Sequence, residues 1–84
     1  MDQYLELIAE VLPGADLESL RARLPLSRVR MLPMKVGCLL SGDISALREI
    51  FPNLSGDPDD AIEVPGHLKD VVASVHQPKP RKLL

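Results

Sequence analysis

The first apolar pattern in the chain covers residues 2–12 and predicts an amphipathic helix. Its apolar side chains follow the i, i+1, i+3, i+4, i+7, i+8 spacing of one helical face, at Tyr4, Leu5, Leu7, Ile8, Val11 and Leu12. The acidic residues Asp2, Glu6 and Glu10 lie opposite this face. Pro13-Gly14 is expected to end the helix, because proline cannot donate a hydrogen bond to the helix and glycine relaxes the turn.

A second short helix is expected from Asp16 to about Leu24. Asp16 is a favourable N-cap residue, and Leu17, Leu20 and Leu24 lie one above another on a helix. Pro25 is expected to end this helix. Since few residues separate it from the helix at 2–12, the two are expected to pack antiparallel.

Residues 26–33 fit two patterns. The segment Arg28-Val29-Arg30-Met31 alternates as a strand does, whereas Val29, Leu32, Val36 and Leu39 keep helical spacing across Pro33. A single strand would have no partner, and no second convincing strand is evident in the sequence. A turn or a short helix is therefore expected here.

Residues 33–51 are expected to form the core as two short helices that meet at Ser41-Gly42-Asp43. Pro33 suits the first position of a helix, Gly42 a left-handed helix end, and Asp43 the cap of the second helix. Loss of the Asp43 carboxylate would then cost about 1 kcal/mol.

The last third of the chain predicts one more helix. Residues 53–66, rich in proline, glycine and acidic residues, form a loop or a single helical turn capped by Asp57. Residues 67–76 place Leu68, Val71, Val72 and Val75 at helical spacing. The segment from 77 onward, with two prolines, favours an extended tail.

These patterns together predict an all-α fold. The expected architecture is a small bundle of four to five short helices with a central helical hairpin. Residues 1–77 form the predicted helical domain, and residues 78–84 form an extended basic tail.

Composition places this domain in the cytoplasm. With 84 residues there is room for one small domain, and one Tyr, one Phe and no Trp leave few rings for stacking nucleic-acid bases. The single Cys38 permits no internal disulfide, and the first residues resemble no signal peptide. The longest runs without a polar side chain, such as 36–40, are far shorter than the roughly 20 residues of a membrane-spanning helix.

The net charge is only −2, but the charges are segregated. Residues 2–18 carry five acids and no bases, and residues 21–35 carry five bases and no acids. Residues 43–70 carry seven acids against two bases, and three bases follow in the tail. These blocks either neutralise one another within the folded domain or leave a basic patch for an acidic partner.

The residues that could carry catalysis or bind a metal are few. Cys38 lies in an apolar segment that raises the pKa of a thiol, so it is expected in the core. His67 and His76 would face opposite sides of a continuous helix and could not share a metal ion. The acids of residues 57–63 lack the glycine and glutamate spacing of an EF-hand loop, and no glycine-rich phosphate loop occurs. The sequence therefore predicts no enzyme, no metal site and no cofactor.

A helix-turn-helix at 33–51 is the alternative interpretation. Its recognition helix would expose Ser45, Arg48 and Glu49, which is a weak set for reading bases. The acidic net charge also disfavours DNA, although the basic segment 21–35 partly offsets it. A small DNA-binding transcriptional regulator remains the second hypothesis.

The function expected first is that of a non-enzymatic protein–protein interaction or assembly module, such as an adaptor, inhibitor or structural component. Its partner would be another protein, including a second copy of this chain, with neither a membrane nor a small-molecule substrate involved. It would act through its charged patches and its C-terminal tail, where two leucines could anchor in a groove. The predicted partner-binding residues are Arg21, Arg23, Arg28, Arg30, Lys35, Lys79, Arg81, Lys82, Leu83 and Leu84.

Overall fold

The computed structural model describes residues 3–25, 27–57 and 59–78. These residues form an antiparallel sheet of four strands with two short α-helices and one 3₁₀ turn, so the all-α prediction is wrong. The elements in chain order are β1 (Tyr4–Val11), α1 (Leu17–Arg21), β2 (Val29–Pro33), β3 (Gly37–Asp43), α2 (Ile44–Ile50), η1 (Gly66–Leu68) and β4 (Val72–His76).

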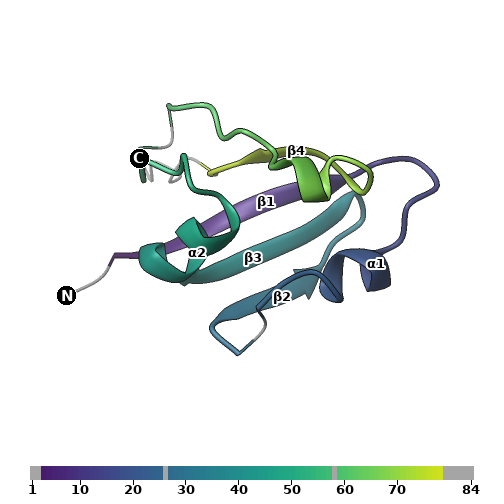
Figure 1. Ribbon diagram of the computed structural model, residues 1–84, viewed down its shortest axis with the longest axis horizontal. Coiled ribbons are helices and arrows are strands. Elements are labelled where there is room, and N and C mark those ends of the chain that lie inside the picture. The colour runs from purple at the N-terminus through teal and green to yellow at the C-terminus, as the bar shows by residue number, and fades with distance from the viewer. Residues whose placement is uncertain (1–2, 26, 58, 79–84) are drawn as a thin grey trace, which may run out of the picture.

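The strands lie in the order β2-β3-β1-β4, which places β3 and β1 in the interior of the sheet (Figure 1). All neighbouring strands are antiparallel, with Leu7 opposite Leu40 in the central pair and Met31 opposite Leu40 in the next. The β1–β4 pair shifts register between Glu10 and Val11. Ile62 forms an isolated bridge with Val75, so the chain before η1 partly covers the β4 edge.

The segment predicted as the first helix is strand β1. Leu5, Leu7 and Ala9 are buried, whereas Tyr4, Glu6 and Glu10 are exposed, which is the period of two that a half-buried strand shows. The helical interpretation of 2–12 is therefore wrong, and so is the antiparallel helix pair built on it. The apolar residue Ile8 lies on the outer face of the strand, and this extra apolar position made the pattern resemble a helix.

The predicted central helical hairpin is also wrong in its first half. Residues 29–33 form strand β2, which pairs with β3 at 37–43 through a tight turn closed by a hydrogen bond from Met34 N to Gly37 O (2.8 Å). The strand pattern at 28–31 was thus the correct one. With a strand where the first helix was expected, residues 33–51 form no helix-turn-helix, so this basis for DNA binding is removed.

The second half of that hairpin is confirmed as helix α2. Asp43 occupies the N-cap position, but its side chain makes no capping hydrogen bond, in contrast to the prediction. Gly42 is a buried strand residue without positive φ. It is needed for another reason, because a Cβ there would lie 2.9 Å from the Arg28 carbonyl oxygen.

Helix α1 is shorter than expected but capped as predicted. Asp16 accepts a hydrogen bond from the backbone N–H of Ser19 at 2.8 Å, and this bond lowers the pKa of its carboxyl. The helix proper ends at Arg21, and the backbone continues in turns to Leu24.

The helix predicted at 67–76 is absent. Residues 66–68 form the 3₁₀ turn η1 and residues 72–76 form β4, where β-branched valines pair with β1. His67 and His76 are thus on different elements, both exposed.

The helices all pack on one face of the sheet. Leu20 of α1, Leu47 of α2 and Leu68 of η1 belong to one buried cluster with the inner side chains of β1 and β3. Figure 1 shows α2 crossing in front of β1 and β3. No described helix is long and apolar enough to cross a membrane. The opposite face of the sheet carries no helix from the described residues and is called the open face below.

Candidate functional site

Three arginines of the predicted basic segment line a single cavity of about 450 Å³ at the β2 edge of the sheet. They are Arg21 from the end of α1, Arg28 just before β2, and Arg30 within β2. This arginine cavity is completed by Tyr4, Ser27, Val29, Met31, Ser41 and Gly42.

Local structure explains why the arginines meet. The N–H groups of Arg28 and Val29 both donate to the carbonyl of Pro25, and this turn brings the chain back from α1 into β2. Within β2, strand alternation places Arg30 on the open face, opposite Ser41 of β3, while Val29 and Met31 face inward.

The three arginines differ in how far they are already engaged. Arg28 forms an exposed ion pair with Glu49 of α2, and it donates a longer hydrogen bond to Ser45 Oγ (3.4 Å). Among the described residues, Arg21 and Arg30 make no hydrogen bond or ion pair. The cavity therefore presents two cations that have no counter-ion among the described residues, beside the hydroxyl-bearing residues Tyr4, Ser27 and Ser41.

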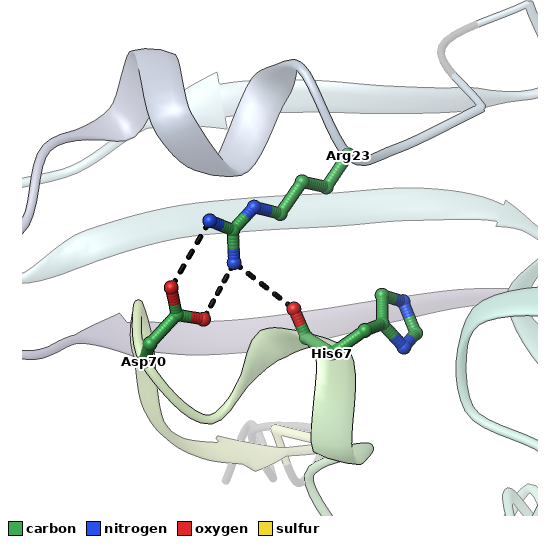
Figure 2. Close-up of polar contacts among 3 residues, drawn as sticks. All are labelled: Arg23, His67 and Asp70. Atoms are coloured by element: carbon green, nitrogen blue, oxygen red, sulfur yellow. Dashed lines mark hydrogen bonds and ion pairs between the residues drawn. The ribbon is translucent and has the colours of Figure 1, made fainter.

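Arg23 is directed elsewhere, as Figure 2 shows. Its guanidinium donates to both carboxylate oxygens of Asp70, at 2.5 and 3.0 Å, and to the backbone carbonyl of His67 at 3.0 Å. The hydrogen bonds raise the pKa of Arg23 and lower the pKa of Asp70. Arg23 is outside the arginine cavity and links the turn that follows α1 to the turn before β4.

Lys35 lies in the β2–β3 turn, away from the arginine cavity. It lines a second, more apolar cavity of about 540 Å³ together with Leu12, Met34 and Val36. The remaining predicted binding residues, Lys79, Arg81, Lys82, Leu83 and Leu84, fall outside the described residues.

The cysteine and the acidic cluster considered as candidate sites are engaged in packing and local hydrogen bonds. Cys38 is fully buried in β3, as predicted, and burial raises the pKa of its thiol to about 11. Asp57 accepts a hydrogen bond from the N–H of Asp59 (2.9 Å), and Asp60 accepts one from the hydroxyl of Ser55 (2.7 Å). Within the described ranges, no His, Cys, Asp and Glu side chains gather to hold a metal ion.

Sequence reasoning identified the arginines of the cavity but missed Tyr4, Ser27 and Ser41. The helical spacing of residues 2–12 predicts Tyr4 on an apolar face, yet 62% of its surface is exposed. Strand alternation over 4–11 was the available signal, because it places Tyr4 and Glu6 on the face opposite Leu5 and Leu7.

Comparisons of this chain with protein-family models, with curated proteins and with solved structures found no match.

Proposed function

We propose that this protein is a non-enzymatic interaction module that binds an acidic segment of another protein at the arginine cavity. The observation that carries the proposal is the pair Arg21 and Arg30, two cations that line one cavity without a counter-ion among the described residues. A guanidinium presents a planar set of donors that matches a carboxylate, so the ligand chemistry expected here is Asp or Glu.

The surroundings of the cavity favour an extended segment over a single carboxylate. The volume of about 450 Å³ accommodates more than one side chain. Exposed Tyr4 is part of the wall, and exposed Leu32 follows Arg30 on the same face of β2, two residues along the strand. Apolar side chains next to an acidic residue would therefore find contacts beside the arginines.

The charge distribution supports an acidic protein rather than nucleic acid. The net charge is −2, and strand β1, next to β3, carries the exposed acids Glu6 and Glu10. The phosphates of a nucleic-acid backbone would be repelled by these acids along the sheet, whereas a short acidic segment contacts only the arginine cavity.

Fluorescence anisotropy with a labelled peptide of alternating Glu and Leu tests the proposal, and a peptide with Gln in place of Glu serves as the probe control. Arg21→Ala is expected to weaken binding of the acidic peptide about tenfold, which corresponds to one lost charge-assisted hydrogen-bonded contact. The affinity of Arg21→Lys is expected to lie between those of the wild type and Arg21→Ala, because lysine keeps the charge but lacks the planar guanidinium.

The matched control is Lys69→Ala, which removes the same charge from an exposed position outside the cavity. Its affinity for the peptide should equal that of the wild type. Equal weakening by Arg21→Ala and Lys69→Ala would show that only overall charge matters. Absence of binding at low salt, or equal binding of the Gln peptide, would also contradict the proposal.

A further inference from the structure

The open face of the sheet carries an apolar row that crosses three strands. By register, Leu32 of β2 lies beside Leu39 of β3, which lies beside Ile8 of β1, and His76 of β4 ends the row. Leu32 is 47% exposed, while Ile8 and Leu39 are half-buried. A sheet face turned to water normally carries polar side chains, so this row marks a surface that is suited to a partner.

Charged residues on the open face lie in a definite order around this row. The adjacent row contains Arg30 on β2, Ser41 on β3 and Glu6 on β1. The base and the acid are thus on opposite sides of β3, each one strand away from it. In this arrangement neither Arg30 nor Glu6 has an ion-pair partner among the described residues.

This order of charges is self-complementary. If a second copy packs face to face about a two-fold axis that runs along β3, β2 of each copy lies opposite β1 of the other. Leu39 then meets Leu39 of the second copy, and Leu32 meets Ile8. Arg30 meets Glu6, and by symmetry this contact forms twice. Two sheets packed in this way lie about 10 Å apart, a separation that Arg and Glu side chains span together.

We propose that the open face is the interface of a homodimer, with Leu32, Leu39 and Ile8 at its centre and Arg30 paired with Glu6 of the second copy. The proposal does not rest on the arginine cavity as a peptide site. Arg30 and Leu32 belong to both surfaces, but Arg21 tests only the cavity and Glu6 tests only the face, since Glu6 does not line the cavity.

Sedimentation velocity on the full chain over a range of concentrations tests the dimer by charge exchange. Arg30→Glu and Glu6→Arg should each weaken dimerisation about 100-fold, because each creates two like-charge contacts. An equimolar mixture of the two variants should form a heterodimer, since every contact is again between opposite charges. The double variant Arg30→Glu with Glu6→Arg should recover the homodimer.

Leu32→Lys gives a second test that does not depend on the charge variants folding. Its side chain is already half exposed, so the fold should persist by circular dichroism while the dimer dissociates. A monomeric wild type at the highest soluble concentration would overturn the proposal. So would a dimer that Leu32→Lys leaves unchanged, or folded charge variants that remain monomeric when mixed.

Discussion

At the scale of single residues, Gly37 permits a close approach of β3 to β1. A Cβ at this position would lie 1.9 Å from the backbone carbonyl oxygen of Ala9, which belongs to the interior strand β1 and cannot move independently. Glycine is required here by contact, since its φ is not positive.

Gly37→Ala is therefore expected to lower the free energy of unfolding by about 1–3 kcal/mol, the usual cost of forcing extra volume into a packed site. Urea denaturation followed by circular dichroism measures this. Gly66→Ala is the control, because a Cβ there has no atom within 4 Å and the change should have little effect. Similar losses in both variants would contradict the steric explanation.

Residue chemistry also explains how far the site could be anticipated. The run of bases without acids at 21–35 predicts Arg21, Arg28 and Arg30 as binding residues. Nothing in the sequence distinguished them from Arg23, which pairs with Asp70 far along the chain. Whether an arginine has an ion-pair partner depends on which acids the fold brings next to it.

At the scale of elements, the Arg23–Asp70 pair joins the turn that follows α1 to the turn that follows η1 (Figure 2). The hydrogen bonds from Arg23 hold the pKa of Asp70 below its usual 3.8. Because the folded pKa is the lower one, the stabilisation is present above about pH 4 and is lost as the pH falls through the folded pKa.

Asp70→Asn should consequently lower Tm at pH 7, and its difference from the wild type should shrink as the pH is lowered below 4. Thermal melts at several pH values follow this difference. Asp43→Asn is a suitable control, since the Asp43 side chain makes no capping hydrogen bond and Asn suits an N-cap equally. A difference for Asp70→Asn that does not vary with pH would argue against the ion pair.

At the scale of the whole molecule, Cys38 reports on global unfolding. It is fully buried on the interior strand β3, and its thiol pKa of about 11 leaves almost no thiolate at neutral pH. Exposure of this side chain requires the helical layer to leave the sheet.

The thiol is expected to react with Ellman's reagent at pH 8 only as fast as the protein unfolds, and fully in denaturant. The urea dependence of its reactivity should coincide with the loss of circular dichroism. Rapid labelling of the folded protein would contradict this placement. Since the raised pKa belongs to the folded state, stability is also expected to fall as the pH rises from 9 towards 11.

Short-range sequence patterns account for the local features of this protein. Asp16 caps α1, a helix follows Asp43, and Cys38 is a core residue, all as the short-range patterns predict. These features depend on neighbours in the chain, since a cap needs only the next few N–H groups.

Long-range contacts are required to make strands of residues 4–11, 29–33, 37–43 and 72–76. An isolated strand is not stable, so each of these segments depends on a partner distant in sequence, as β1 does on β3. When these partners are not known, the apolar spacing of β1 and β4 is also compatible with a helix. The same long-range pairing placed Tyr4 and Ser41 beside the arginines and exposed the apolar row on the open face.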